Sequence, residues 1–204
     1  ILLNFLSFNK KYINYLRKKN FYLINISKHT KGPLYSIYLA KKKIKEIIRE
    51  NQNIFISYCD INWTWNKKKI LKEIKKYNNV VFTHKGFHPH LNVNSKSDFC
   101  ASKNNKILDI SEKKTFSKNY EDDFLAIGCY FIKEFKEIDN FFEKKQLKNK
   151  KEFYLTTFIK YLIKKKMTIG NILISNFVID IEAINDIIPK IVKLIMKFIT
   201  AYLI

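Results

Sequence analysis

Two aspartates in the sequence each follow an apolar segment of strand length. Asp60 comes at the end of the run 54–59, and Asp180 comes at the end of the run 177–179. In open α/β sheets, ligands bind outside the carboxyl ends of strands. Carboxylates at that position can hold Mg²⁺, which in turn can hold a nucleotide phosphate. If both strands lie in one sheet, the two carboxylates can converge on a single Mg²⁺ ion. The alternative is two independent loop carboxylates, and the spacing leaves both interpretations open.

A second group of polar residues could bind a sugar phosphate. Glu112-Lys113 directly follows a predicted strand and offers an acceptor for sugar hydroxyls beside a cation for phosphate, although Glu-Lys pairs are common in lysine-rich chains. His88 and His90 are two residues apart across Pro89 and lack further ligands at the spacing that zinc sites show. This loop is therefore expected to shape a pocket and not to bind zinc.

The composition is that of a folded domain. The 204 residues are 47% hydrophobic and 15% aromatic, which supports a packed core and argues against disorder. Three cysteines at unrelated spacings predict neither a disulfide framework nor a metal cluster, which fits a reducing compartment. The apolar start 1–8 lacks a basic n-region and a cleavage site, so we expect no signal peptide and a cytoplasmic location.

The chain is strongly basic, with 39 Lys and Arg residues against 18 Asp and Glu residues and a formal net charge of +21. Such a charge can indicate nucleic acid or a membrane surface as the partner. Nearly all of it is lysine spread over most segments, whereas phosphate-reading patches are usually clustered and richer in arginine. We therefore expect no nucleic-acid partner, and a positive field that favours anionic substrates such as nucleotides and sugar phosphates.

Hydrophobic periodicity predicts an alternation of helices and strands. Helices are expected at residues 9–19, 34–49, 67–77, 135–144 and 153–165, with a last one from residue 184 onward. Strands are expected at residues 21–26, 54–58, 80–83, 99–102, 107–111, 124–132 and within 168–177, with a hairpin turn at 103–106. Gly128 lies inside the strand 124–132, where a glycine often marks the close approach of a ligand or another backbone.

The order strand, helix, strand over residues 21–58 is typical of a βαβ unit. The sequence therefore predicts an α/β domain over residues 1–186 with a Rossmann-like mixed, mostly parallel sheet and helices on both faces. One proline and three lysines interrupt the apolar run 187–204. This run is therefore expected to form an amphipathic helix that packs on the domain, and no membrane span.

Several short motifs occur in order over residues 30–186. They are Thr30-Lys31-Gly32-Pro33, Ile56-Ser57-Tyr58-Cys59-Asp60, Gly86-Phe87-His88-Pro89-His90, Ile107-Leu108-Asp109-Ile110-Ser111-Glu112-Lys113, Ile127-Gly128-Cys129-Tyr130-Phe131, Glu152-Phe153-Tyr154-Leu155-Thr156 and Asp180. Together they resemble the sugar-phosphate nucleotidyltransferases. The Gly-Phe-His-Pro-His loop is similar to that of the branch found in capsule and surface-polysaccharide synthesis.

The resemblance implies an activity and a set of roles. Members of this family join a nucleoside triphosphate to a sugar 1-phosphate and release pyrophosphate, and the protein contributes positioning, Mg²⁺ and cations. By resemblance, Asp60 and Asp180 would ligate Mg²⁺, and Asp60 and Lys113 would be catalytic. Substrate-binding roles are implied for Gly32 against the nucleotide base, Gly86 and His88 in the pocket loop, Glu112 with Lys113 at the sugar and its phosphate, and Gly128 and Tyr154 in the sugar pocket.

The sequence departs from the family in two places. Nothing in residues 1–30 resembles the glycine-rich signature that carries the family's activating arginine and lysine, so we expect a chain that lacks the first β-strand unit. After Asp180 the family usually shows Gly-Thr, whereas Glu182-Ala183 stand near that place here. Two alternative functions stay open: a GT-A-like glycosyltransferase that uses a nucleotide sugar, and a non-catalytic remnant of the nucleotidyltransferase fold.

Overall fold

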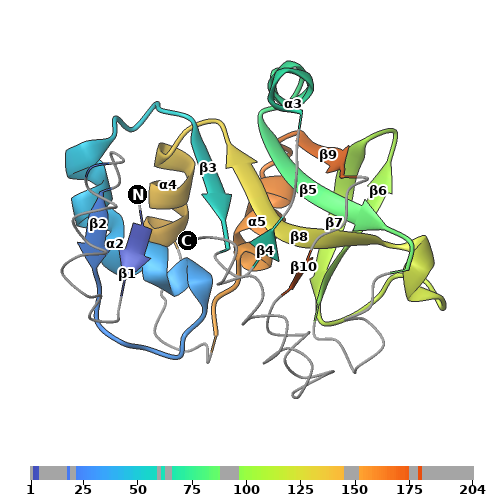
Figure 1. The fold of residues 1–204 in the computed structure, drawn as a ribbon, viewed down its shortest axis with the longest axis horizontal. Helices are drawn as coiled ribbons and strands as arrows, with labels where there is room; N and C mark the ends of the chain where they lie inside the picture. Colours follow the sequence, from blue (N-terminus) through green and yellow to red (C-terminus); the bar gives the residue numbers. More distant parts are fainter. Residues whose placement is uncertain are drawn as a thin grey trace. The chain divides into compact units, whose positions relative to one another are not determined.

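The chain divides into two compact units. The structure, a computed structural model, describes residues 2–4, 18, 22–58, 61–62, 66–87, 97–144, 152–174 and 179–180. Unit 1 is formed by Ile1–Ile54 and Ile132–Lys165, and unit 2 by Phe55–Phe131 and Lys166–Ile204. The helices and strands are labelled in Figure 1.

The described part of unit 1 contains three complete helices and a small sheet. The helices are α2 (Pro33–Ile47), α4 (Lys136–Lys144) and α5 (Leu155–Lys164), and the strands β1 (Leu2–Asn4) and β2 (Leu23–Asn25) pair in parallel. Helix α2 begins at a proline, which suits the first turn because an N–H there has no partner within the helix. Its buried residues recur at helical spacing, as predicted: Leu34, Ile37, Ala40 and Ile44.

Aromatic side chains join the helices of unit 1. The ring of Phe141 in α4 lies edge-on to Phe158 and Tyr161 of α5, with centroid distances of 5.5 and 5.2 Å. Phe142, the next residue of α4, lies edge-on to Tyr38 of α2 at 5.3 Å. Edge-to-face contacts of this kind add to the stabilisation from burial itself.

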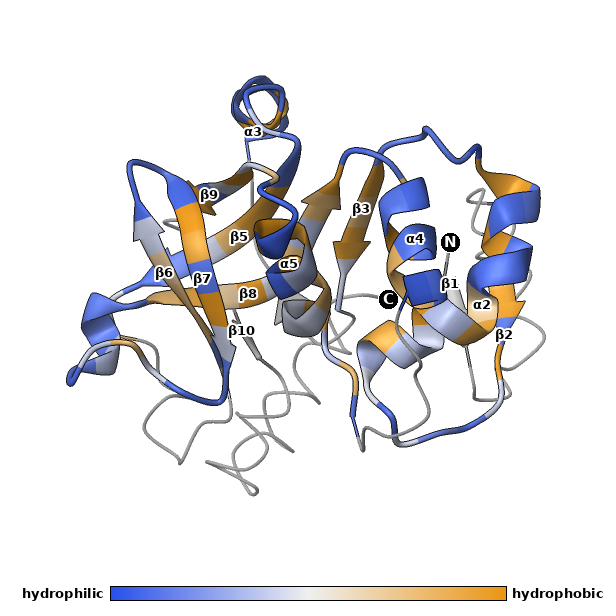
Figure 2. Cartoon of the chain, turned by 180° about the vertical axis from the view of Figure 1, so that it is seen from behind, coloured by the Kyte–Doolittle hydropathy of each residue, from blue (hydrophilic) through white to orange (hydrophobic). Residues whose placement is uncertain are grey.

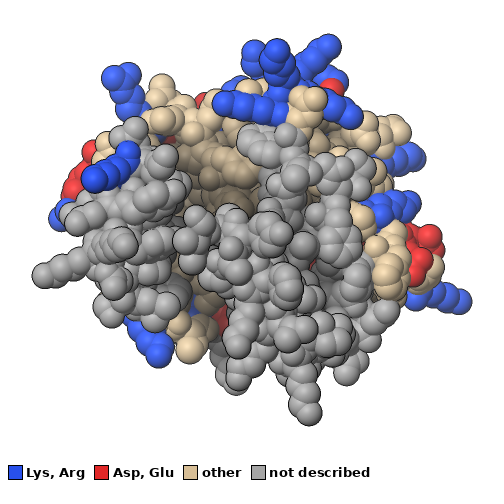
Figure 3. Space-filling model, in the orientation of Figure 1, with Lys and Arg blue, Asp and Glu red and all other residues tan. Residues whose placement is uncertain are grey.

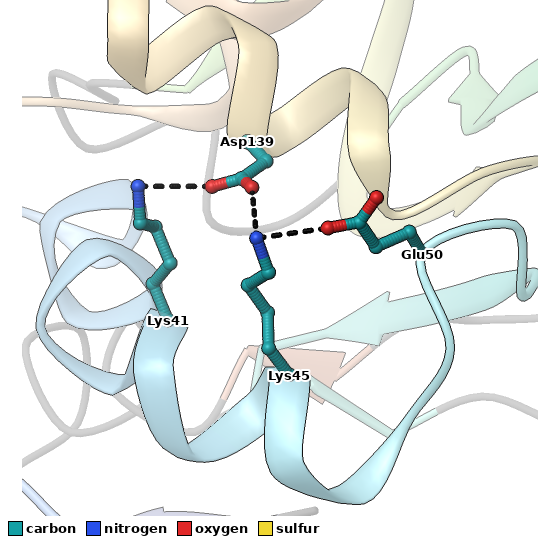
Figure 4. A network of polar contacts seen from close by, with 4 residues as sticks. All are labelled: Lys41, Lys45, Glu50 and Asp139. Carbon is teal, nitrogen blue, oxygen red and sulfur yellow. Dashed lines mark hydrogen bonds and ion pairs between the residues drawn. The ribbon is translucent and has the colours of Figure 1, made fainter.

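A network of charges fastens α2 to α4 (Figure 4). Asp139 of α4 accepts from Lys41 at 2.9 Å and from Lys45 at 2.7 Å, and Lys45 also pairs with Glu50 at 2.9 Å. Burial raises the pKa of the Asp139 carboxyl, but the hydrogen bonds from Lys45 and Lys41 outweigh burial and leave that pKa below its ordinary value. The carboxylate is therefore held in its charged form between the two helices.

Unit 2 is built on a six-stranded sheet. The strands, in spatial order, are β3 (Ile54–Ser57), β8 (Phe124–Ile132), β5 (Asn79–Lys85), β9 (Ile169–Leu173), β7 (Lys106–Glu112) and β6 (Asp98–Lys103). Strand β6 also pairs with β8, so the strands from β8 around to β6 form a closed ring. Strands β5 and β9 run parallel, whereas the pairs β6–β7, β6–β8 and β7–β9 are antiparallel.

The prediction of an α/β fold with a mixed sheet is confirmed. The predicted mostly parallel, Rossmann-like arrangement of the strands differs from the structure, in which the mixed sheet closes on itself. A two-residue hairpin between β6 and β7 imposes an antiparallel pair, and β6 then closes the sheet on β8. The expected βαβ unit is also absent from the described residues, because β2 pairs with β1 and not with β3. Helices on both faces stay a prediction, since α3 is the only described α-helix that belongs to unit 2, beside a single 3-10 turn at Tyr120–Asp122.

Helix α3 (Lys67–Ile74) and the sheet enclose the core of unit 2. Asn66 begins the helix by accepting from the backbone N–H of Lys69 at 3.0 Å, a typical N-cap. Its buried Ile70 and Ile74 face apolar side chains of β5, β8, β9 and the residue after β9: Val80, Phe82, Ile127, Cys129, Ile172 and Ile174. Figure 2 shows β3, β5 and β8 as largely hydrophobic and α3 as mostly hydrophilic.

The predicted β6–β7 hairpin is confirmed. Asn104 and Asn105 form its turn with φ values of 51° and 56°, the left-handed conformation that asparagine tolerates in two-residue hairpins. A register shift between Ala101 and Ser102 follows, and beyond it Asp98 pairs with Glu112. Irregularities of this kind re-aim the side chains that follow them.

Some predictions fall on other residues. The expected helices over 9–19 and 187–204 lie outside the described residues, apart from helical Lys18. Within the part of the chain that the structure describes, no helix is both long enough and apolar enough to cross a membrane.

Candidate functional site

Two short strands bring distant parts of the sequence together. Strand β4 (Ile61–Asn62) pairs antiparallel with β10 (Ile179–Asp180), and Asp180 lies opposite Ile61. Asp60 directly precedes Ile61 in the sequence, although its own placement is outside the described residues. The backbone of Asp180 therefore lies beside Ile61, the residue that follows Asp60. Two carboxylates are oxygen donors of the kind that Mg²⁺ prefers, so the donor set fits this metal.

The residues whose side chains the structure describes contain no further candidate for a metal centre. Among these residues, no three His, Cys, Asp or Glu side chains lie close enough together to hold a metal ion. The predicted pair formed by Asp60 and Asp180 is not covered by that search, because their side chains lie outside it. The metal-binding roles of these two residues stay predictions.

The Glu112-Lys113 pair lies at the end of β7. The ammonium of Lys113 is 3.6 Å from the Glu112 carboxylate, and each side chain is about one-third exposed, at 37% and 35%. Lys113 has a left-handed φ of 58°, and its N–H donates to the carbonyl of Ser97 at 3.0 Å. A left-handed lysine is uncommon, and the surrounding structure must hold it in that conformation. The pair therefore presents one carboxylate and one ammonium side by side.

Asp98 completes this cluster, which we call the acid–base cluster (Asp98, Glu112 and Lys113). Its pKa is raised to about 7, mainly by burial and in smaller part by the negative charge of Glu112, while Lys113 acts in the opposite direction. The sequence reasoning missed Asp98. Counting back from the hairpin turn places Asp98 opposite Ser111, and the register shift moves it to Glu112. The predicted hairpin therefore locates the partner of Asp98 to within one residue.

The loop after Lys113 is anchored by the buried Asp123. Its carboxylate accepts from the backbone N–H groups of Phe116 at 2.6 Å and Ser117 at 3.0 Å, and from the hydroxyl of Ser117. A carboxylate satisfied by several donors in a buried place fixes the loop that carries them. Asp123 was also absent from the predicted residues.

Gly128 occupies the interior of β8, as predicted, and its close neighbour is an aromatic ring. Its φ is 73°, and a Cβ there would lie 2.7 Å from Cδ2 of Tyr58. The N–H of Tyr58 donates to the carbonyl of Gly128 at 3.1 Å, and the Tyr58 ring lies 6.1 Å from that of the fully buried Tyr130. Glycine is therefore needed at this position for conformation and for space. A contact with a sugar stays a prediction.

Gly86, at the start of the Gly-Phe-His-Pro-His loop, has a different reason to be glycine. Its φ is 96°, and no atom lies within 4 Å of the place where a Cβ would be. Its N–H donates to the carbonyl of Glu121 at 3.2 Å, which fastens the start of the loop. His88 is outside the described residues, so its predicted role in the pocket is untested.

In unit 1, Gly32 is held against the segment that precedes α5. A Cβ on Gly32 would lie 2.6 Å from the carbonyl oxygen of Phe153, and φ is 80°. Two backbone bonds join these segments: Phe153 N–H to the carbonyl of Lys31 at 2.7 Å, and Leu34 N–H to the carbonyl of Phe153 at 3.0 Å. Tyr154, the last residue before α5, donates its hydroxyl to Glu152. The described contacts therefore bring Gly32 together with Phe153, the residue before Tyr154.

His29 orders the loop before Gly32. Its Nδ1 accepts from the N–H of Lys31 at 3.1 Å, and its Nε2 lies 3.0 Å from the hydroxyl of Ser36. Acceptance at Nδ1 assigns the proton of the neutral ring to Nε2, which then donates to Ser36. Burial, and then the charge of Lys31, lower the pKa of His29. This histidine was not predicted as part of the site.

Comparison with solved structures identifies the fold. Similar structures include the nucleoside-diphosphate-sugar pyrophosphorylase from Vibrio cholerae RC9 (TM-score 0.59, 15% identity, 81% of this chain and 69% of that chain). Others are a provisionally assigned glucose-1-phosphate thymidylyltransferase from Bacillus anthracis, solved with sucrose (0.61, 14%, 83% and 65%), and the inositol-1-phosphate CTP transferase from T. maritima (0.59, 15%, 82% and 64%). The chain has the fold of these proteins.

The likeness in fold covers part of each solved structure. The chain spans 64% to 69% of the length of these three structures, at identities of 14% and 15%. No protein-family model matches the sequence, and no curated protein matches it either. The resemblance in motifs and the likeness in fold point in the same direction, while the roles of individual residues stay predictions.

Proposed function

We propose that the protein is a sugar-1-phosphate nucleotidyltransferase, which joins a nucleoside triphosphate to a sugar 1-phosphate and releases pyrophosphate. The observation that carries the proposal is the pairing of β10 with β4, with Asp180 opposite Ile61 and hence beside the residue that follows Asp60. The fold shared with three structures of nucleotidyltransferase type supports it independently. The motifs in the Gly-Phe-His-Pro-His loop favour a role in capsule or surface-polysaccharide synthesis, in the cytoplasm, where nucleoside triphosphates are available.

In the proposed reaction, a phosphate oxygen of the sugar 1-phosphate attacks the α-phosphorus of the triphosphate in line. A new P–O bond forms, the bond to the oxygen that bridges the α- and β-phosphorus breaks, and pyrophosphate leaves with that electron pair. Asp60 and Asp180 would hold Mg²⁺, which when bound neutralises charge on the phosphates. Catalysis of this type depends on positioning and electrostatics more than on covalent participation of the protein.

The acid–base cluster fits the sugar phosphate. Lys113 would pair with the phosphate of the sugar phosphate, and Glu112 would accept a hydrogen bond from a sugar hydroxyl. The two side chains are neighbours, and their opposite charges suit these two groups of the ligand. The raised pKa of Asp98 means that its carboxyl is protonated in a large part of the molecules near neutral pH. Asp98 then repels an incoming phosphate less than an ordinary aspartate would.

The proposal is tested by pyrophosphate release. The full-length protein is incubated with Mg²⁺ and a panel of nucleoside triphosphates and sugar 1-phosphates, and the pyrophosphate formed is measured. We expect release with one pair of substrates, and a loss of about a hundredfold or more in Asp60→Asn and in Asp180→Asn, since a metal ion contributes several kcal/mol to such reactions. Asp122→Asn, an exposed aspartate of unit 2, is the matched control and should keep full activity.

Three other results would contradict the proposal. Full activity of Asp60→Asn would exclude the metal role on which it depends. Transfer of sugar from a nucleotide sugar without pyrophosphate release would indicate a glycosyltransferase. Binding of nucleotide without any turnover over the whole panel would indicate a non-catalytic remnant of the fold.

A further inference from the structure

Helix α3 of unit 2 concentrates positive charge far beyond the average of the chain. Six of the twelve residues 66–77 are lysine, whereas lysine and arginine together make up 39 of the 204 residues. The segment contains one acidic residue, Glu73, and this carboxylate is taken up by Lys76 at 2.7 Å. Six lysines against one glutamate leave the segment with a formal excess of five positive charges.

The orientation of α3 sends this charge outward. Ile70 and Ile74 are 5% exposed and pack on the sheet, which fixes the inner side of the helix. The lysines at 67, 68, 69, 72, 75 and 76 are all exposed. Figure 3 shows the result as a dense group of blue side chains over α3.

An apolar side chain stands in the middle of these lysines. Leu71 is 45% exposed, whereas Ile70 and Ile74 of the same helix are buried. Lys67 and Lys75 lie four residues before and after it, Lys68 lies three residues before it, and Lys72 follows it. Residues three or four apart on a helix are surface neighbours, so Lys67, Lys68 and Lys75 flank Leu71, and Lys72 in turn neighbours Lys68 and Lys75. We call Leu71 with Lys67, Lys68, Lys72 and Lys75 the lysine face.

We propose that the lysine face of α3 binds the anionic headgroup layer of a lipid membrane. Lysines close to such a layer are attracted by its negative potential, and their long side chains extend toward the phosphates while apolar neighbours go deeper. Leu71, flanked by Lys67, Lys68 and Lys75, is placed for such a contact. The inference does not depend on the proposed catalytic activity.

The residue types favour lipid over nucleic acid as the partner. Residues 66–76 contain neither arginine nor an aromatic side chain, and these are the types that stack on bases or grip phosphates in two places. Tyr77, the nearest aromatic residue on the C-terminal side, is packed against Gly170, whose missing side chain leaves room for the tyrosine ring. A layer of headgroups needs only point charges and an apolar contact, and the lysine face offers both.

The test compares two variants of equal charge. In the face variant, Lys67, Lys68, Lys72 and Lys75 are changed to Gln; in the control variant, the exposed Lys42, Lys103, Lys106 and Lys118 are changed to Gln. Each variant loses four positive charges from the formal +21 of the parent. Binding is measured by co-sedimentation with phosphatidylcholine vesicles that contain phosphatidylglycerol, and with pure phosphatidylcholine vesicles as the neutral reference.

We expect the parent to bind the anionic vesicles and not the neutral ones, and to release them in about 1 M salt, where charges are screened within about 3 Å. The face variant should bind about tenfold more weakly or worse, because each lysine near the surface contributes to binding. The control variant should bind within about twofold of the parent, since general attraction is equal in both. Leu71→Gln should weaken binding by on the order of threefold through the lost apolar contact.

Several outcomes would overturn the inference. Equal loss in the face and control variants would mean that overall charge attracts the vesicles, and absence of binding by the parent would exclude the membrane surface outright. Binding of a single-stranded RNA or duplex DNA probe that the face variant alone loses, together with no binding to vesicles, would assign the lysine face to nucleic acid. Unchanged vesicle binding by Leu71→Gln would contradict the apolar contact.

Discussion

Asp98 should make the stability of the protein fall as the pH rises toward neutrality. The pKa of its carboxyl is raised from 3.8 to about 7, chiefly by burial. A group with a higher pKa in the folded state binds its proton more tightly there than in the unfolded chain. Its stabilising contribution is therefore fully present below about pH 4 and is lost as the pH rises through about 7.

The size of this effect follows from the two pKa values. At about 1.4 kcal/mol per pKa unit, the difference between 3.8 and about 7 corresponds to a ceiling of about 4 kcal/mol. The carboxyl keeps some contact with solvent, so we expect about 2 to 4 kcal/mol in the free energy of unfolding. This is a large share of the roughly 5 to 15 kcal/mol by which domains are stable.

Asp98→Asn removes the charge while nearly keeping the shape of the side chain. We expect the free energy of unfolding of this variant, relative to the parent, to rise by about 2 to 4 kcal/mol between about pH 4 and about pH 8. Urea unfolding followed by circular dichroism at several pH values measures it. Asp122→Asn, at an exposed position of the same unit, is the control and should follow the parent at every pH.

The neighbours of Asp98 provide an independent check. Glu112→Gln removes a negative charge that raises the pKa of Asp98, so the loss of stability should end at lower pH and be smaller in total. Lys113→Met removes a positive charge that lowers this pKa, so the loss should extend to higher pH and be larger in total. Parallel pH profiles of the parent and Asp98→Asn would refute the reasoning, because the carboxyl would then titrate equally in the folded and unfolded states.

Two further predictions concern structural contacts. Gly128→Ala should lower the free energy of unfolding by about 2 to 4 kcal/mol, because φ is 73° and the new Cβ would lie 2.7 Å from the Tyr58 ring. The double variant Gly128→Ala with Tyr58→Ala should lose less stability than the two single variants added together. Additive losses would show that the Tyr58 ring is not the obstacle. Asp139→Asn should lower the free energy of unfolding by about 1 to 3 kcal/mol, because it weakens the contacts with Lys41 and Lys45. Glu46→Gln, which removes an exposed ion pair with Lys43, should change thermal stability little. Equal effects of the two changes would show that burial of Asp139 does not strengthen its ion pairs.

Local elements could be predicted from the sequence because their signals are short-range. The strand 124–132 was predicted with the bounds that β8 has, and the hairpin at 103–106 followed from Asn104-Asn105. A helix was predicted over residues 67–77, and α3 spans Lys67–Ile74, with Ile70 and Ile74 buried at helical spacing. In each case the residues that specify the element lie within a few positions of one another, so that propensity and periodicity suffice.

The partners of these elements were decided only by the tertiary structure. Nothing in the local pattern of β6 reports that it pairs with β8 and closes the sheet, or that β2 pairs with β1. Strand pairing depends on which edges the packed core leaves available, and many arrangements satisfy the same local pattern.

The same division holds for the candidate site. The sequence by itself indicated Asp60, Asp180 and the Glu112-Lys113 pair, because acidic and basic residues at strand ends stand out. The tertiary structure alone set Asp180 opposite Ile61, and the register shift in the hairpin moved Asp98 from Ser111 to Glu112. Burial and a neighbouring charge then raised the pKa of Asp98, and both depend on residues that the sequence keeps apart.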